Sequence, residues 1–127
     1  MATQVINTQE APAPIGPYQQ AILSGNMLFI SGQIPIDAKT DQLIKSDIQA
    51  ETHQVMKNLK AILSAAGMDF SHVVKSSIFV TDMNDFSAVN EVYGKYFSGG
   101  NFPARETVQV AALPKAVHVE ISMIAAK

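Results

Sequence analysis

Arg105 is the residue of this chain whose chemistry is best suited to binding an anion. It is the only arginine among 127 residues, and every other basic side chain that is charged at pH 7 is a lysine. A guanidinium is a planar fork that holds a carboxylate through two parallel hydrogen bonds, whereas a lysine ammonium acts as a point charge. An arginine near a strand end can equally well pair with a neighbouring acid, here Glu106, or lie along the surface. The residue type therefore leaves both carboxylate binding and a structural role open.

Glu120 is the second candidate, because it lies on the polar face of an alternating segment. Apolar side chains occupy the odd positions of residues 117–125, so Glu120 faces the other way. It could act as a general acid or base if that face lines a cleft, although a solvated glutamate is more common. We expect the last two strands to pair as a hairpin. Glu120 then lies opposite Gln109 and shares one polar face with Arg105, roughly 13 Å away, which leaves room for a small acid and a water.

Four further residues have a polar group or a backbone suited to a binding pocket. Asn90 interrupts the apolar stripe of a predicted helix, so we expect it to be partly buried and hydrogen-bonded, for structure or for function. Ser31 and Gly32 end an apolar strand, where the glycine would let a ligand approach the backbone or would simply form a bulge. Tyr18 follows a glycine and a proline, so its hydroxyl could face a pocket or anchor a loop.

Composition excludes several classes of site. The chain has no cysteine, which rules out disulfides, thiolate zinc and a cysteine nucleophile. Its histidines, His53, His72 and His118, show no metal-ligand spacing, and we assign neither a metal nor a cofactor. No phosphate-binding loop or nucleophile motif is present.

Charge and hydropathy narrow the choice of partners. The formal net charge is -2, the pI is near 5.8 and the lysines are scattered, so we expect no nucleic-acid partner. No apolar run approaches the length of a membrane span, and the first ten residues lack the features of a signal peptide. We therefore expect a cytoplasmic protein without a membrane partner.

A long helix is the clearest element that could support these residues. Residues 47–66 carry apolar side chains on one helical face. Ser46 and Gln49 match a capping box at its start, and Gly67 is typical of a helix end.

The remaining elements complete an α+β order. They are a hairpin of residues 22–23 and 27–31, a strand at 72–81, a helix that begins at Asp82 or Asn84 and has an apolar stripe from Phe86 to Phe97, and strands at 106–112 and 117–125. This order predicts a single domain over residues 1–127, with two helices packed on one face of a mixed sheet. Nothing in the chain is left to cover the other, partly apolar face, so we expect a homo-oligomer.

Six short stretches together resemble the RidA (YjgF) family of reactive-intermediate deaminases. They are Gly16-Pro17-Tyr18, Ser31-Gly32-Gln33, Asn90, Pro103-Ala104-Arg105, Leu113-Pro114-Lys115 and Val119-Glu120-Ile121. The likeness spans nearly the whole chain. The arginine, Leu-Pro-Lys and Val-Glu-Ile at their fixed distances make it far more specific than any single residue.

The resemblance implies a chorismate-mutase-like fold, a homotrimer with a barrel of sheets at its core, and active sites between subunits. It implies a 2-iminobutanoate/2-iminopropanoate deaminase, which hydrolyses 2-imino or 2-enamino acids to 2-keto acids and ammonia and so protects pyridoxal-phosphate enzymes from 2-aminoacrylate. Arg105 would hold the substrate carboxylate, and Glu120 would position or activate water. The implied pocket is completed by Tyr18, Ser31, Gly32, Asn90 and the backbone of Thr107.

Two positions depart from the residues usual in that family: Glu106 replaces a small residue, and Thr107 replaces a cysteine. Strand alternation predicts that Glu106 points away from Arg105. Two other functions stay open. One is a non-catalytic sensor of small carboxylates that uses the same Arg105 pocket, and the other is cleavage of single-stranded RNA, against which the acidic pI weighs.

Overall fold

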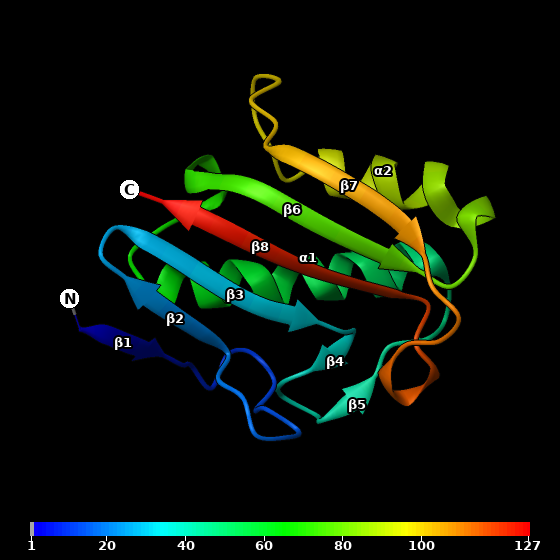
Figure 1. The fold of residues 1–127 in the computed structure, drawn as a ribbon. Helices are drawn as coiled ribbons and strands as arrows, with labels where there is room; N and C mark the ends of the chain where they lie inside the picture. Colours follow the sequence, from blue (N-terminus) through cyan, green and yellow to red (C-terminus); the bar gives the residue numbers. More distant parts are fainter. Residues whose placement is uncertain (1) are drawn as a thin grey trace.

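A six-stranded mixed sheet forms one layer of the protein, seen face-on in Figure 1. The structure is a computed structural model that describes residues 2–127. The strands lie in the spatial order β1-β2-β3-β8-β6-β7, and all neighbours are antiparallel except β6 and β7, which are parallel. Their bounds are Thr3–Ile6 (β1), Ala21–Ser24 (β2), Met27–Gln33 (β3), Val73–Val80 (β6), Ala104–Gln109 (β7) and Val119–Ala126 (β8).

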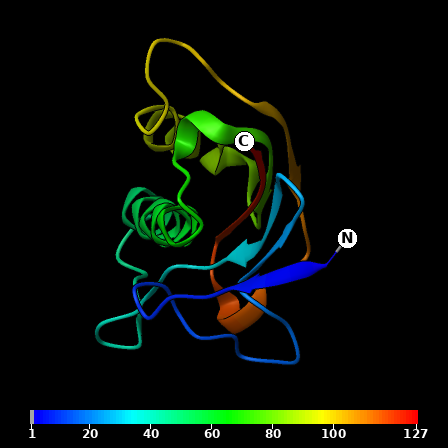
Figure 2. The ribbon, with the colours of Figure 1, turned by 90° about the vertical axis from the view of Figure 1, so that its left-hand side faces the viewer.

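Two helices form the second layer, and both lie on the same side of the sheet, as the edge-on view in Figure 2 shows. They are α1 (Ile48–Ala65) and α2 (Phe86–Gly94). The α+β class and the placement of the helices on one face are therefore as predicted. Neither helix has the length and hydrophobicity of a membrane span.

The core lies between α1 and the sheet. Every second residue of β8 is buried, and these side chains meet the apolar face of α1. The fully buried members from these two elements are Val55, Met56, Leu59, Ile62, Leu63, Val119, Ile121 and Ala125. Period-two burial on the strand and a helical stripe on α1 are the patterns that the sequence predicted.

The cap of α1 differs from the prediction by one residue. Asp47, not Ser46, is the N-cap, and its Oδ1 accepts a hydrogen bond of 2.7 Å from the Ala50 amide. A carboxylate there also stabilises the positive end of the helix dipole. Gly67 ends the helix as predicted: its φ is 71°, and its amide donates to the Ser64 carbonyl at 2.9 Å.

The second helix is shorter than its apolar stripe suggested. Asp82 caps a 3-10 turn over Met83–Asp85, and α2 then runs only to Gly94. Tyr96 and Phe97 lie beyond its end in turns. Phe86, expected in the core, is 38% exposed, because it starts the helix beside β7 rather than beneath the sheet.

The early hairpin is confirmed, with Ser24 paired to Met27 across Gly25 and Asn26. Two small features were not predicted. Strand β1 extends the sheet at its edge, although two of its four residues are polar. The arm after β3 contains a two-stranded ribbon of β4 (Ile36–Asp37) and β5 (Gln42–Leu43).

The predicted hairpin between the last two strands is wrong. Strand β6 lies between β7 and β8, parallel to the first and antiparallel to the second. Glu120 consequently lies opposite Phe79 rather than Gln109. Alternating hydrophobicity reports which face of a sheet a residue occupies, but it does not identify the neighbouring strand.

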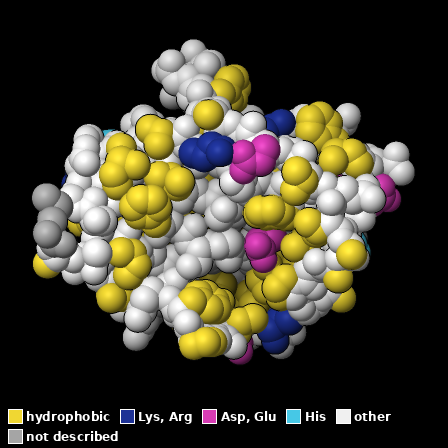
Figure 3. All heavy atoms as spheres, in the orientation of Figure 1, with side chains coloured by type: hydrophobic (Ala, Val, Ile, Leu, Met, Phe, Trp, Pro, Cys, Tyr) yellow, Lys and Arg dark blue, Asp and Glu magenta, His cyan; other side chains and the backbone are white. Residues whose placement is uncertain are grey.

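The sheet face opposite the helices is open and partly apolar. Val5, Phe29 and Val108 lie on it, each between 41% and 46% exposed. Figure 3 shows several groups of hydrophobic side chains over this face, with few charged ones. An uncovered surface of this kind is typical of a protein interface.

Candidate active site

Arg105 lies on β7 and points toward α2, on the helix side of the sheet. Its Cα is in register with that of Ser76, whose side chain is buried on that side. The guanidinium Nη1 donates a hydrogen bond of 2.6 Å to Asn90 Oδ1. Its Cζ lies 5.2 Å from the ring centroid of Tyr93 and 5.7 Å from that of Phe86. Asn90 is therefore partly buried and hydrogen-bonded, as its place in the helix predicted.

The positive charge of Arg105 has no acidic partner among residues 2–127. Within residues 2–127, no carboxylate oxygen lies within 4.0 Å of its guanidinium. Asn90 is a neutral acceptor, and aromatic rings attract a cation without neutralising it. The guanidinium thus keeps the charge and the donors that a carboxylate ligand would use.

Glu106 points to the opposite face of the sheet, as strand alternation predicted. Its carboxylate pairs with the Lys75 ammonium at 2.9 Å and accepts a hydrogen bond from the Ser77 hydroxyl. The Ser77 bond, followed by the contact with Lys75, lowers the pKa of Glu106. Glu106 does not compete for Arg105.

A hollow of about 350 Å³ opens beside Arg105, a volume suited to a small ligand. Its lining combines one cation and one amide with apolar surface from Tyr93, Phe102 and Pro103. Phe102 is 59% exposed, which leaves that wall open to another molecule.

Glu120 lies on the open face of β8, beside the backbone of β3. A β-carbon at position 32 would lie 2.6 Å from Glu120 Oε2 and 2.8 Å from its Cδ, so only glycine allows this approach. Partial burial raises the pKa of Glu120 above the ordinary value of 4.5. A carboxyl group with a raised pKa is better suited to exchange protons near neutral pH.

Ser31 and Gly32 form a bulge in β3, which was one of the two predicted readings. The pairing with β8 shifts register between Ile30 and Gln33. The Ser31 hydroxyl donates to the Gln19 carbonyl at 2.6 Å, which holds the preceding loop against the strand.

Tyr18 lies in that loop and is 44% exposed. Its hydroxyl accepts a weak hydrogen bond of 3.3 Å from the Ile15 amide, so the side chain closes a local turn and stays partly exposed. Tyr18 and Gly32 also line a hollow of only about 20 Å³. That is room for about one water molecule.

Within one chain, the two groups of residues do not meet. Arg105 and Asn90 lie on the helix side of the sheet, whereas Glu120 and Gly32 lie on the open side. Glu120 is in register with Val108 across β6, and Arg105 lies three residues before Val108. Two strand spacings and this offset put the Arg105 and Glu120 α-carbons roughly 14 Å apart. The prediction that Arg105 and Glu120 share one polar face is wrong. Strand β6 lies between β7 and β8, and its pairing with each strand puts the two side chains on opposite faces.

Thr107 lies two residues after Arg105 and points to the same side of β7, in register with Ile78. Its hydroxyl is buried and has no hydrogen-bond partner within the described part of the chain. A buried hydroxyl without a partner is costly.

Phe86 and Tyr93, which contact Arg105, had no functional role in the prediction from the sequence. Both were placed in the apolar stripe of the helix. Their positions four residues before and three residues after Asn90 put all three on one helical face, and that spacing was the available signal.

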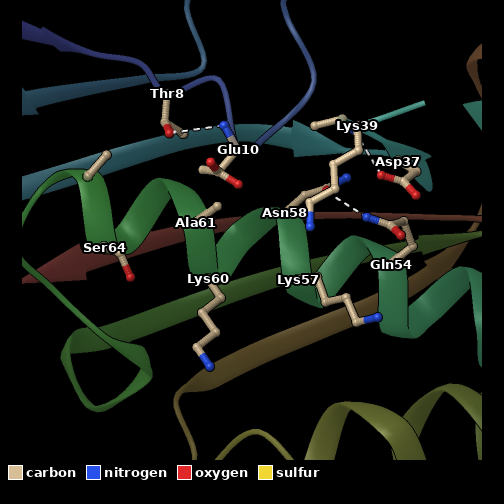
Figure 4. Close-up of a pocket in the computed structure, with 12 residues that line it drawn as sticks. Thr8, Glu10, Asp37, Lys39, Gln54, Lys57, Asn58, Lys60, Ala61 and Ser64 are labelled. Carbon is tan, nitrogen blue, oxygen red and sulfur yellow. Dashed lines mark hydrogen bonds between the residues drawn. The ribbon is translucent and has the colours of Figure 1, made fainter. Parts of the chain in front are cut away.

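A second hollow, of about 620 Å³, lies between α1, the N-terminal segment and β4 (Figure 4). Its charged residues have both signs, and Lys57 and Lys60 point away from Glu10 (Figure 4). The buried amide of Asn58 already donates to the carbonyls of Ile34 and Ile36. No set of polar groups converges there.

Comparison with known proteins identifies the family. Residues 8–127 match the family model described as endoribonuclease L-PSP. The chain belongs to the RidA (YjgF) family. Protein DfrA from Myxococcus xanthus is 54% identical over 127 residues, which cover 98% of this chain and 96% of that protein. The human 2-iminobutanoate/2-iminopropanoate deaminase is 48% identical over 122 residues, which cover 96% of this chain and 88% of the human protein.

Solved structures of RidA proteins share the fold. Escherichia coli TdcF with bound serine has a TM-score of 0.93 at 43% identity, with 98% of each chain covered. RidA from an Antarctic Psychrobacter species has a TM-score of 0.93 at 44% identity, over 98% of this chain and 99% of that one. The RidA fold is therefore the one predicted from the sequence motifs.

Proposed function

We propose that this RidA-family chain hydrolyses 2-imino and 2-enamino acids to 2-keto acids and ammonia. The observation that carries the proposal is the single arginine, which a neutral amide and two aromatic rings hold and which has no acidic partner in the described part of the chain. Such a group is prepared to bind a carboxylate. The deaminase activity named for the human relative supplies the reaction class.

Arg105 would hold the substrate carboxylate through two parallel hydrogen bonds. Its Nη1 is shared with Asn90, and the other guanidinium donors have no partner within residues 2–127. Binding through the carboxylate orients the adjacent C=N bond, and orientation alone can lower a barrier by several kcal/mol. The protonated imine carbon is already electrophilic, so the step requires neither a metal nor a cofactor.

Glu120 would activate the attacking water. As water adds to the imine carbon, the carboxylate accepts one of its protons. The resulting carbinolamine nitrogen then takes a proton and leaves as ammonia, while the C–O bond becomes the carbonyl of the keto acid. The raised pKa of Glu120 supports both the acceptance and the return of the proton.

A complete site would need two copies of the chain. The Arg105 group and the Glu120 group lie on opposite faces of one sheet, roughly 14 Å apart, which excludes joint action on one small acid. We place the Arg105 group of one copy against the Glu120, Tyr18, Ser31 and Gly32 group of another. A homotrimer whose open sheet faces pack into a central barrel would bring these two groups together. Phe29 and Val108 are apolar and exposed on that face in the single chain, which supports its burial in an oligomer.

In this arrangement Thr107 would help to orient the substrate beside Arg105. The unpartnered hydroxyl supports a place near a ligand, in addition to the backbone contact expected from the family resemblance. In the cell, the reaction would remove reactive enamines such as 2-aminoacrylate before they damage pyridoxal-phosphate enzymes.

The description of the family model names an endoribonuclease. A formal net charge of -2 gives this chain little attraction for a phosphate backbone. The uncompensated charge at Arg105 is a single site beside a small hollow, which suits a small carboxylate better than a polymer.

The test is to generate 2-iminobutanoate enzymatically and to follow the release of 2-oxobutanoate with wild-type protein, Arg105→Ala and Glu120→Ala. We expect acceleration by the wild type and near-complete loss in both variants. If wild-type protein binds 2-oxobutanoate tightly but does not accelerate hydrolysis, the chain is a carboxylate sensor and the deaminase proposal is wrong.

A further inference from the structure

A pair of buried hydroxyl groups lies behind Arg105. The Tyr93 hydroxyl donates a hydrogen bond of 2.8 Å to Ser76 Oγ, and the two residues are only 3% and 0% exposed. Burial raises the pKa of Tyr93, which keeps the phenol protonated and able to donate. Two hydroxyls in an apolar core contribute little net stability over a pair of apolar side chains. Their presence therefore calls for another explanation.

The pair is connected to Arg105 from both sides. Ser76 is the residue of β6 in register with Arg105, so their side chains emerge next to each other on the same face. The Tyr93 ring lies 5.2 Å from the guanidinium Cζ. The hydrogen bond thus joins the strand beside Arg105 to the ring that contacts it.

We infer that Tyr93 and Ser76 are positioning residues for Arg105, because their hydrogen bond fixes the ring on which the guanidinium lies. Asn90 holds only Nη1, about which the guanidinium plane can still tilt. A fixed aromatic face restricts that tilt and directs the free donors toward the hollow. The expected change in KM rests on the proposed function. The expected change in how firmly the Arg105 guanidinium is held does not.

Three variants test the inference: Tyr93→Phe, Ser76→Ala and the double variant. Each keeps the aromatic ring and removes the hydrogen bond. The double variant leaves neither hydroxyl unpaired, so we expect it to fold with a Tm near that of the wild type. We expect all three to raise KM for the imino acid about three- to tenfold with little change in kcat, because substrate and transition state lose the same binding contact. The double variant should lose no more than either single one.

The spectroscopic readout uses the fact that Arg105 is the only arginine. A protein labelled with ¹⁵N gives one arginine Nε–H signal, whose position and exchange with water report how firmly the guanidinium is held. We expect this signal to shift and to exchange faster in all three variants. This measurement needs no substrate, so it tests the inference even if wild-type protein fails to hydrolyse imines and the proposed function is wrong.

Thr52→Val is the matched control. Thr52 is also fully buried, and its hydroxyl donates at 2.7 Å to the Ile48 carbonyl, so this hydrogen bond lies within α1 and does not involve Arg105, Asn90 or Tyr93. We expect it to lower Tm while KM and the Arg105 signal stay unchanged. An unchanged Arg105 signal in the double variant, or an equal change in Thr52→Val, would overturn the inference.

Discussion

The carboxylate of Glu120 lies against Gly32 so closely that a β-carbon at position 32 would be 2.6 Å from Oε2. Any side chain larger than that of glycine would force this carboxylate to move. The bulge in β3 and the side chain from β8 therefore form one unit, although 88 positions separate the two residues in the sequence.

Gly32→Ala should displace the Glu120 carboxylate and lower kcat about tenfold or more, because a misplaced catalytic group loses the advantage of orientation. Steady-state hydrolysis of 2-iminobutanoate measures the effect. The control is the same substitution in a Glu120→Ala background, where the clash is gone and Gly32→Ala should cause no further change in Tm. A wild-type rate in Gly32→Ala would show that the exact place of this carboxylate does not matter.

Asn90→Asp should weaken substrate binding by neutralising Arg105. The substitution keeps the shape of the side chain and turns a neutral acceptor into a carboxylate within 2.6 Å of the guanidinium. We expect KM to rise by about tenfold or more, since the ligand must now compete with an internal ion pair. Asn90→Ala keeps the charge of Arg105 free and should raise KM less. Equal effects of the two variants would argue against the importance of the free charge.

Mixed oligomers should reveal a site built from two chains. Neither Arg105→Ala nor Glu120→Ala is expected to be active alone. If the two groups come from different copies, a refolded 1:1 mixture recovers about a quarter of wild-type activity, because about one site in four receives both intact groups. A mixture prepared without subunit exchange is the control. Absence of recovery after proven exchange would place both groups in one chain.

The pH dependence should follow Glu120. The proposed base is active when deprotonated, so kcat/KM should rise with pH through a midpoint above the ordinary value of 4.5. Glu120→Gln should abolish that limb of the profile, and a rate profile that titrates at or below 4.5 would contradict the assignment.

Ionisation of Glu120 should lower the stability of the fold, whereas it should raise the activity. Its pKa is raised in the folded state, so the folded chain binds more protons than the unfolded chain between 4.5 and the raised value. The free energy of unfolding should therefore fall as pH rises through that window. Thermal denaturation of the wild type and Glu120→Gln at a series of pH values measures the difference.

Local features of the fold were predictable because they depend on neighbouring residues. The helical stripe of α1, the turn at Gly25 and Asn26, and the buried strand before α2 all follow from periodicity and turn chemistry. The direction of Glu106, away from Arg105, followed from alternation along a single strand. The cap at Asp47 was missed by one residue, because several polar residues in a row can each serve as a cap.

By itself, the sequence determined the family and the α+β class, and it singled out the side chains that we propose to carry the chemistry, since these depend on residue types at fixed spacing. Only the tertiary structure decided that β6 separates β7 from β8, and so that Arg105 and Glu120 lie on opposite faces of the sheet. Strand order arises from contacts between segments far apart in the chain, and the alternation of apolar and polar residues within each strand does not predict it. The same contacts brought Asn90, Phe86 and Tyr93 around Arg105, which is therefore a held cation with no acidic partner among the residues that the structure describes.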